Sequence, residues 1–293
     1  MGNIRAELFA LVERAAAALV LPPVAQVLIA DPRPSPERDA EFGLLALTDG
    51  AAGLYYAWLG ASQAAMPARF LADSFAGRPV LELARLVLAD DDGARSVGVA
   101  AINAVTAHVH AQAGFVPASA SDSFGGLVLE RHDRLGMIGN FPPLVRRARK
   151  LGVPTFVVER KAHMITASAG LVISLDPTIL LGCTKIICTG ATLLNDSLDQ
   201  MLAHCRSAAQ LALVGPTVGF FPDAVFARGV DVVAGTRIID PALAYARLRA
   251  GAKLGDSAER TVIRRAEYPG FTVLLERARM RALQHAGAPS AHA

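Results

Sequence analysis

Apolar residues recur with two different periods in the first part of the chain. Between residues 3 and 20 they fall on a helical repeat that includes Ile4, Leu8 and Val12, and Pro22-Pro23 ends the predicted helix. Strands are predicted at 24–30, 42–48 and 53–58, the last two flanking Asp49-Gly50, with a proline-rich loop at 31–38. Helices are predicted at 79–88 and 94–111. Strands followed by helices indicate an α+β arrangement.

After a stretch of small and polar residues the pattern changes to short apolar runs that alternate with helical segments. The runs lie at 135–138, 155–158, 185–189, 211–214 and 230–234, and the helical segments at 143–151, 193–204, 222–228 and 241–250. Buried strands alternating with helices predict a doubly wound parallel sheet, so the fold class is α/β with a Rossmann-like domain. A charged helix is expected at 272–285. We predict an α+β domain over 1–115, a linker over 116–130 and the Rossmann-like domain over 131–293.

The composition of this chain argues against a membrane span and against nucleic acid as a partner. Its mean hydropathy of +0.37 comes from Ala, Val and Leu, since aromatic residues make up only 6%, and no apolar run has a membrane span's length. The net charge of +3 is small and its arginines are scattered, so nucleic acid is not expected. With no signal-peptide pattern and an odd number of cysteines, we expect reduced thiols and a cytoplasmic location.

Polar loops follow the predicted parallel strands. Gly139-Asn140 follows the first, Glu159 the second, Thr189-Gly190 the third and Gly215-Pro216-Thr217 the fourth. Ligands of open parallel sheets bind where such loops converge, and glycines there let backbone N–H groups approach an anion. The alternative is that the glycines only terminate strands. Thr192 and Asn195 could bind the same ligand or act only as helix caps.

A nucleotide site is a weaker interpretation of these loops. Glu159 lies twenty residues after Gly139, where dinucleotide-binding folds place a carboxylate for the ribose. The first loop, however, has one glycine and two prolines instead of the G-x-G-x-x-G pattern. No paired carboxylates, nucleophile elbow or P-loop indicate a reaction, so whether the chain is an enzyme stays open.

Candidate metal ligands are scattered along the sequence. Cys183, Cys188 and Cys205 match no zinc spacing, so burial in the core competes with a metal or redox role. His108 and His110 are two residues apart on a predicted helix and therefore point to different faces. Asn103, in the apolar part of the same helix, needs a hydrogen-bond partner. It either bonds to a neighbouring strand or linker, or reaches the site that faces Gly139, Thr189 and Gly215.

Several sequence blocks resemble a family of two-domain heavy-metal chelation proteins. They are Ser96-Val97-Gly98-Val99-Ala100-Ala101-Ile102-Asn103-Ala104, Gly136-Met137-Ile138-Gly139-Asn140-Phe141-Pro142-Pro143-Leu144-Val145, Val158-Glu159-Arg160, Thr189-Gly190-Ala191-Thr192-Leu193-Leu194-Asn195, Leu213-Val214-Gly215-Pro216-Thr217 and Gly229-Val230-Asp231-Val232-Val233-Ala234-Gly235. The resemblance implies an enolase-N-terminal-like α+β domain, a Rossmann-like C-terminal domain and a cleft between them. It also implies a role in handling metals or metal-containing cofactors.

Two functional hypotheses follow. The first is a binding or accessory protein that holds a metal ion or an anionic metal chelate in the cleft, with a homodimer as the expected assembly. The second is an enzyme that acts on a nucleotide-like or other anionic small molecule at the same loops. We predict Glu159 as the metal ligand, with no metal identity implied. The predicted ligand-binding residues are Asn103, Gly139, Asn140, Thr189, Gly190, Thr192, Asn195, Gly215, Pro216 and Thr217.

Overall fold

The computed structural model describes residues 2–30, 42–57, 61–70, 74–122 and 124–286. The predicted loop at 31–38 lies outside these residues. The N-terminal elements are helix α1 (Ile4–Ala18), strands β1 (Val24–Leu28), β2 (Phe42–Leu47) and β3 (Ala52–Tyr56), helices α2 (Ala61–Arg69) and α3 (Val80–Ala84), the 3₁₀ helix η2 (Arg85–Leu88) and helix α4 (Asp92–Ala113). The predicted helices and strands of this part are confirmed. Helix α2 was not predicted, and it carries Pro67 in its interior, where proline is usually disruptive.

Helix α4 is the central element of the N-terminal part. The side chain of Asp91 caps its first turn by accepting the Ala94 N–H at 2.7 Å, and Gly114 ends it in the left-handed conformation with φ 62°. The antiparallel strands β1, β2 and β3 form one sheet in that order, and α4 packs against β3. Asn103 therefore lies between this small sheet and the rest of the molecule.

The second sheet contains the predicted parallel strands. Its elements are β4 (Ala118–Ser119), β5 (Leu135–Ile138), α5 (Pro142–Leu151), β6 (Thr155–Val158), η3 (Ala162–Met164), β7 (Thr166–Ser168), β8 (Leu171–Ser174), η4 (Pro177–Leu180), β9 (Lys185–Thr189), α6 (Ala191–Leu194), α7 (Leu198–Ala203), β10 (Gln210–Val214), α8 (Asp223–Phe226), β11 (Val232–Ile238), α9 (Pro241–Arg249), η5 (Gly255–Ser257), β12 (Ala258–Arg264) and α10 (Phe271–Ala286). The parallel core runs β11-β10-β9-β5-β6-β8. The predicted α/β class is confirmed.

The chain reverses its direction of travel across this sheet between β5 and β9. Strands β5, β6 and β8 follow one another toward one edge, whereas β9, β10 and β11 follow one another toward the other. This is the strand order of dinucleotide-binding folds, in which the crevice opens at the carboxyl ends of the two strands at the reversal. A ligand is therefore expected at the loops after β5 and β9.

The edges of the large sheet were not predicted. Strand β12 is antiparallel to β11, β4 is antiparallel to β12, and β7 is antiparallel to β8. All three residues of strand β7 are exposed and β12 carries charged residues, so neither has the continuous apolar pattern of the buried strands. Strand β4 lies within the predicted linker.

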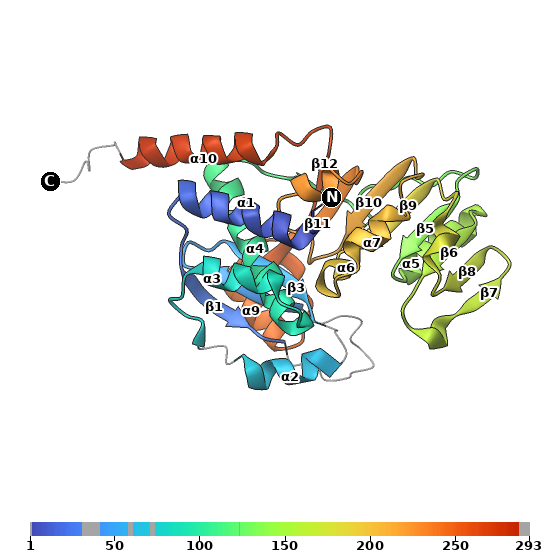
Figure 1. The fold of residues 1–293 in the computed structure, drawn as a ribbon, viewed down its shortest axis with the longest axis horizontal. Helices are drawn as coiled ribbons and strands as arrows, with labels where there is room; N and C mark the ends of the chain where they lie inside the picture. The colour runs from blue at the N-terminus through green and yellow to red at the C-terminus, as the bar shows by residue number, and fades with distance from the viewer. Residues whose placement is uncertain (1, 31–41, 58–60, 71–73, 123, 287–293) are drawn as a thin grey trace.

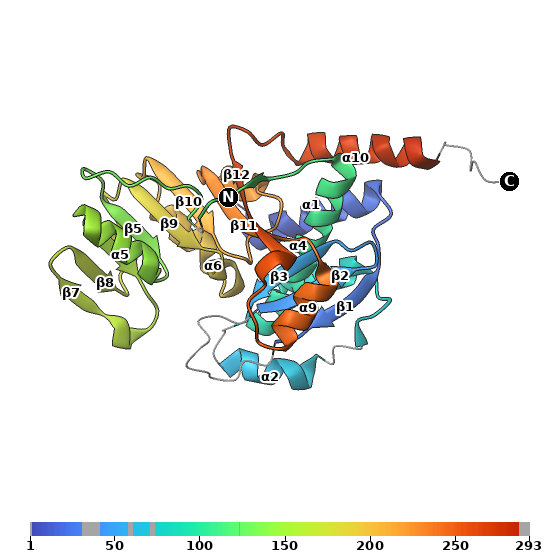
Figure 2. The same cartoon turned by 180° about the vertical axis from the view of Figure 1, so that it is seen from behind.

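The C-terminal elements return to the N-terminal part of the fold. Ala244 on α9 is buried with Leu44 and Leu54 of the small sheet, and Figure 2 shows α9 beside β2. Helix α10 packs along α4, and its C-terminal end extends past the other elements (Figure 1). The division into domains at residues 115 and 131 stays a proposal. The return of α9 and α10 means that the two parts share a core.

Candidate functional site

The loops at the carboxyl ends of β5, β9 and β10 lie next to one another. A Cβ added to Gly139 would be 3.0 Å from Cγ2 of Thr189, and one added to Gly215 would be 3.8 Å from the nitrogen of Gly190. Gly139 and Gly215 have φ of +86° and +133°, which other residues rarely adopt. The structure therefore brings Gly139, Thr189, Gly190 and Gly215 together in one row along the sheet edge.

The glycine N–H groups of this row have partners within the protein. Gly139 donates to the carbonyl oxygen of Val158 at 2.9 Å, Gly190 to that of Val214 at 2.8 Å, and Gly215 to that of Ala234 at 2.9 Å. Each of these N–H groups extends the hydrogen bonding of the parallel sheet by one residue, so an anion bound here would contact other groups of the same loops. A ligand contact of Gly139, Gly190 or Gly215 through other atoms stays a prediction.

The helix after β5 also lacks the donors that a phosphate needs. Pro142 and Pro143 occupy the first two positions of α5 and have no N–H, and the N–H of Leu144 donates to the carbonyl oxygen of Phe141 at 2.9 Å. Dinucleotide-binding folds place the pyrophosphate at this helix start. The loop is therefore built differently from a dinucleotide-binding loop, although the strand order is the same.

Glu159 is fixed at the carboxyl end of β6. Its Oε1 accepts the N–H groups of Arg160 at 2.8 Å and Lys161 at 3.2 Å, and its Oε2 accepts the N–H of Asn140 at 3.2 Å. The Oδ1 atom of Asn140 is buried without a hydrogen-bond partner in the described part of the chain. A carboxylate has about four acceptor positions, so Glu159 keeps some capacity for a cation.

Tyr56, the last residue of β3, lies near enough to Glu159 for the charge of this carboxylate to act on its hydroxyl. Burial raises the pKa of its hydroxyl above the usual 10, and the negative charge of Glu159 raises it further. The sequence did not indicate Tyr56, which reads as one more apolar residue of a strand. The signal in the sequence that could have identified Tyr56 is its position at the carboxyl end of a predicted strand. Tyr56 remains protonated and can donate a hydrogen bond to an anionic oxygen.

Thr217 and Asn103 connect the two parts of the protein next to this row. The N–H of Tyr56 donates to Oγ1 of Thr217 at 2.9 Å. Nδ2 of Asn103 donates to the carbonyl oxygens of Leu54 and Thr217, both at 2.8 Å. Asn103 thus does bond to a neighbouring strand, and the same amide also reaches the loop after β10. These bonds hold β3 against the sheet edge.

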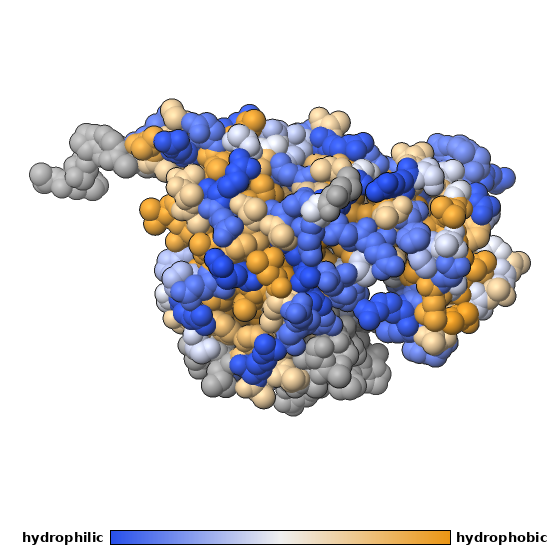
Figure 3. Space-filling view, viewed as in Figure 1, coloured by the Kyte–Doolittle hydropathy of each residue, from blue (hydrophilic) through white to orange (hydrophobic). Residues whose placement is uncertain are grey.

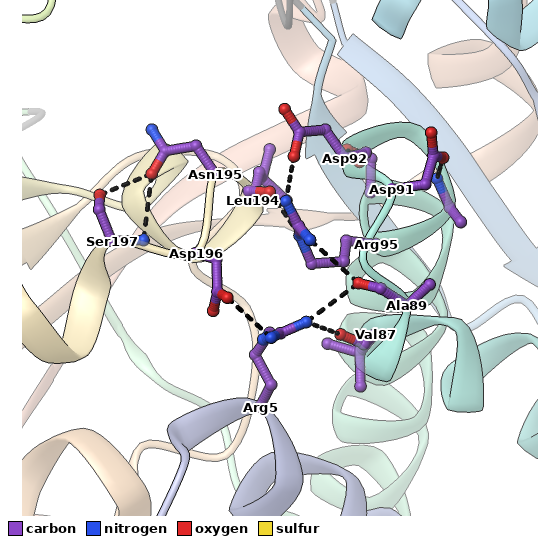
Figure 4. Close-up of polar contacts among 12 residues, drawn as sticks. Arg5, Val87, Ala89, Asp91, Asp92, Arg95, Leu194, Asn195, Asp196 and Ser197 are labelled. Carbon is purple, nitrogen blue, oxygen red and sulfur yellow. Dashed lines mark hydrogen bonds and ion pairs between the residues drawn. The ribbon is translucent and has the colours of Figure 1, made fainter.

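The polar side chains of the α6 segment have local partners. Oγ1 of Thr192 donates to the carbonyl oxygen of Thr189 at 2.6 Å, and Figure 4 shows the Asn195 side chain turned toward Ser197, from whose N–H and hydroxyl it accepts hydrogen bonds. A ligand role for Thr192 and Asn195 stays a prediction. Their present contacts are those of residues that shape a helix.

Two buried arginines join α6 to the N-terminal helices (Figure 4). Arg5 bonds to Asp196 at 2.8 Å and to the carbonyl oxygen of Ala89 at 3.0 Å. Arg95 donates to the carbonyl oxygen of Leu194 at 2.7 Å, also reaches Ala89, and pairs with Asp92. The arginines thereby fix α6, and with it the loop that begins at Thr189, relative to α4.

The three cysteines are free thiols in the hydrophobic core. Burial raises the pKa of the Cys183 thiol to about 11 and that of Cys188 to about 12. Burial also raises the pKa of Cys205, with an added contribution from Cys188 and Cys183. Metals bind the thiolate form, so these sulfur atoms are poor ligands near neutral pH. In the described part of the chain, no three His, Cys, Asp or Glu side chains are grouped to hold a metal ion.

We therefore expect all three thiols to resist modification in the folded protein. At pH 8 a thiol with a pKa of 11 is about one-thousandth thiolate, and burial restricts access as well. An aromatic disulfide reagent should label less than one thiol per chain in buffer and three in denaturant. Rapid labelling of a thiol in the folded protein would contradict this assignment.

His110 is a buried, neutral residue on α4. Burial lowers the pKa of its imidazole to about 4, and its ring packs edge-on against Phe115 and Phe221. The unfolded chain, with a histidine pKa near 6.5, takes up a proton at higher pH than the folded chain does. Stability should therefore fall as the pH drops from about 6.5 to 4, by at most about 3 kcal/mol. Urea unfolding at several pH values should show this dependence, and His110→Phe should remove it.

Comparison with known proteins identifies the family. Two family models described as "Putative heavy-metal chelation" match residues 42–106 and 122–266, which together make up more than half of the chain. The chain belongs to this family. An uncharacterized protein of Methanocaldococcus jannaschii is 30% identical over 170 residues, which span 57% of this chain and 64% of that protein. The family's description supports a metal-related binding role.

Two solved structures share the fold. A protein of unknown function from the DUF364 family of Pyrococcus horikoshii has a TM-score of 0.66 and 20% identity, with 89% of this chain and 98% of that chain covered. Another from Desulfitobacterium hafniense has a TM-score of 0.63 and 20% identity, with 88% and 98% covered. In the described residues, none of the helices has both the length and the apolar character of a membrane span.

Proposed function

We propose that this protein binds a metal ion or an anionic metal chelate at the carboxyl edge of its large sheet, in a cleft between its two domains. The observation that carries the proposal is Glu159, a carboxylate that three backbone N–H groups fix and whose charge acts on Tyr56 of the N-terminal part. Figure 3 shows a hollow between the two parts of the molecule with hydrophilic residues on its borders. Such a hollow would admit a small ligand.

The atoms at this position fit a cation that prefers oxygen. Glu159 offers a carboxylate, Asn140 an amide oxygen and Tyr56 a hydroxyl, whereas the sulfur atoms are protonated and lie in the core. A single carboxylate supplies too few ligands for a metal ion. We therefore infer that the other ligands belong to a small chelator, whose anionic oxygens would meet the exposed Arg160 and Lys161. In this proposal the protein recognises a metal that is already chelated.

The remaining predicted residues would shape the site. Gly139 and Gly215 let the backbone turn tightly after β5 and β10. Any other residue would be strained at their positive φ angles. The side chains of Thr189 and Thr217 would lie along the row. Separately, the buried free thiols agree with a reducing, cytoplasmic location. A binding or accessory role is favoured over catalysis, since no acid and base are paired at the edge among the described side chains.

The substitution Glu159→Gln tests the role of the carboxylate. Glutamine removes the charge and keeps one acceptor oxygen, which can serve the N–H groups of Arg160 and Lys161, while the longer 3.2 Å bond from the Asn140 N–H is lost. We expect binding of Mn²⁺, measured by electron paramagnetic resonance with citrate as chelator, to weaken at least about tenfold at similar thermal stability. Asp240→Asn is the matched control, because Asp240 only caps α9 and asparagine caps equally well. Equal Mn²⁺ binding by wild type and Glu159→Gln would contradict the proposal.

The alternative function is an enzyme that acts on an anionic small molecule at the same loops. The reversal of strand order between β5 and β9 favours it, because this is where such folds bind nucleotides. Pro142 and Pro143 argue against a nucleotide, since they remove two N–H donors from the helix start. Thermal stabilisation by ATP or S-adenosylmethionine, lost in Glu159→Gln, would favour the enzyme over the metal-binding protein.

A further inference from the structure

A cavity lies next to the loop after β10, which also borders the row of Gly139, Thr189, Gly190 and Gly215. Its volume is about 380 Å³, and it is enclosed by α4, the turn before β3, the 216–220 loop and one face of β11 and β12. Val233, Gly235, Thr261 and Ile263 form the floor, where Gly235 pairs with Thr261 and Val233 with Ile263. None of the residues Gly139, Asn140, Glu159 or Thr189 lines it.

Small residues create this space. Ala107, Ala111 and Gly114 present little side chain on the α4 side. A Cβ on Gly235 would lie 1.9 Å from the carbonyl oxygen of Val218, so the loop rests directly on β11. Leu54, Phe115, Val218 and Phe220 complete the apolar part of the wall, and polar groups make up nearly half of the lining surface. A volume of this size is within the range of small-molecule sites.

Two polar atoms on the lining of this cavity are buried without a hydrogen-bond partner in the described structure. They are Oδ1 of Asn103 and Nε2 of His110, and these residues are only 3% and 8% exposed. Both lie on the cavity face of α4, seven residues apart, which separates them by about 10 Å along the helix. Buried polar atoms are rarely left unpaired, so an outside partner is expected for each.

The charged groups around the cavity are already paired. Asp49 bonds to Nδ1 of His108 at 2.7 Å, and Arg237 pairs with Glu259 at 2.7 Å. The ring of His110 contacts Phe115 and Phe221 rather than a carboxylate. An ionic ligand would therefore lose its hydration without gaining a free counter-charge.

We propose that this cavity binds an uncharged, largely apolar ring compound that donates a hydrogen bond, through an amide or hydroxyl group, to Oδ1 of Asn103. Oδ1 can only accept, which makes a donor on the ligand necessary. The apolar ring lies between α4 and the floor of β11 and β12, and the far end of the compound reaches the imidazole of His110. Asn103 and Pro216, two of the predicted ligand-binding residues, line this cavity, whereas Glu159 and Asn140 do not. Binding of an uncharged ligand here therefore does not depend on the proposed metal site.

Benzamide and benzoate test the proposal as probes of equal shape. Benzamide has an amide donor and no charge, whereas benzoate has a charge and no donor. Using ¹⁵N-labelled histidine, we expect benzamide to shift the His110 imidazole signal with a Kd on the order of 1 mM. Benzoate should bind at least about tenfold more weakly. No shift of His110 up to about 10 mM benzamide, or equal affinity for both probes, would overturn the proposal.

Two variants locate the binding. Ala107→Leu fills the cavity without removing a polar contact and should weaken benzamide binding at least about tenfold, measured by titration calorimetry. Ala10→Leu makes the same change on the exposed side of α1 and should leave the affinity unchanged. His110→Phe keeps the aromatic packing and gives a second test if Ala107→Leu fails to fold; it should also bind benzamide more weakly. Wild-type affinity in both cavity variants would place benzamide elsewhere and overturn the assignment.

Discussion

Replacing Gly53 with alanine is expected to destabilise the protein by roughly 3 kcal/mol or more. Gly53 lies in β3 where the strand backbone touches the backbone of α4. A Cβ there would be 2.2 Å from the carbonyl oxygen of Ala100 and 2.6 Å from the nitrogen of Ala104. Backbone atoms of a buried helix cannot move aside as a flexible side chain does. Urea unfolding followed by circular dichroism should show the lower free energy of unfolding.

Gly50→Ala separates the effect of space from that of backbone conformation. Gly50 has a φ of +89° and open space around its Cβ position, so alanine should cost only about 1 kcal/mol there. At Gly53 the φ angle suits any residue, but backbone atoms of α4 occupy the space that a Cβ would need. Equal losses in the two variants would show that α4 does not pack on β3 as closely as described.

The substitution Asn103→Asp is expected to lower the free energy of unfolding by roughly 3 to 5 kcal/mol near pH 7. Asn103 uses its amide nitrogen to donate to two carbonyl oxygens. A carboxylate has nearly the same shape but cannot donate, and it would place a buried charge 2.8 Å from both oxygens. Burial should raise the pKa of the introduced carboxyl above 3.9. The loss should therefore shrink as the pH falls toward 5, since the protonated form can donate again.

Asn195→Asp is the control for this change. Its side chain only accepts hydrogen bonds, from Ser197, and a carboxylate can accept them equally well. We expect a change below about 0.5 kcal/mol. Hydrogen exchange should locate the damage of Asn103→Asp at β3 and the 215–219 loop, which the native amide connects. A loss in Asn195→Asp as large as that in Asn103→Asp would contradict the proposed role of Asn103.

The sequence predicted the buried strands well because they are continuous apolar runs. β5, β6, β9 and β10 begin and end within a residue of the predicted ranges. β12 was missed because charged residues interrupt its apolar pattern. β8 was also missed, although it is as apolar and as long as β5 and β6. α2 was missed because Pro67 interrupts it.

The site was predictable in position but not in detail. Glycines after parallel strands had to lie along one edge, and Gly139, Thr189, Gly190 and Gly215 do. Their N–H groups are occupied because each strand pairs for one residue beyond its apolar run, which depends on register and cannot be read from composition. Tyr56 was missed for a similar reason. Only the packing of β3 against the sheet edge brings it toward Glu159.

The oxygen atoms and the sulfur atoms of this protein lie in different surroundings. In the proposed metal site Glu159 is the carboxylate ligand and accepts the N–H of Asn140, while Asn103 and Thr217 connect the two parts of the protein. The sulfur atoms that a soft heavy metal would prefer are buried in the core. The metal-binding proposal therefore depends on oxygen ligands and on a chelator that supplies the rest.

The most direct test of the central claim is elemental analysis by mass spectrometry, with native mass spectrometry for small ligands, on protein purified without chelators or a metal-binding tag. We predict a stoichiometric metal together with a small anionic chelator in the wild-type protein. Both should be lost in Glu159→Gln and retained in Asp240→Asn. Metal-free wild-type protein that carries a nucleotide, or that is stabilised only by one, would contradict the account and favour the enzyme.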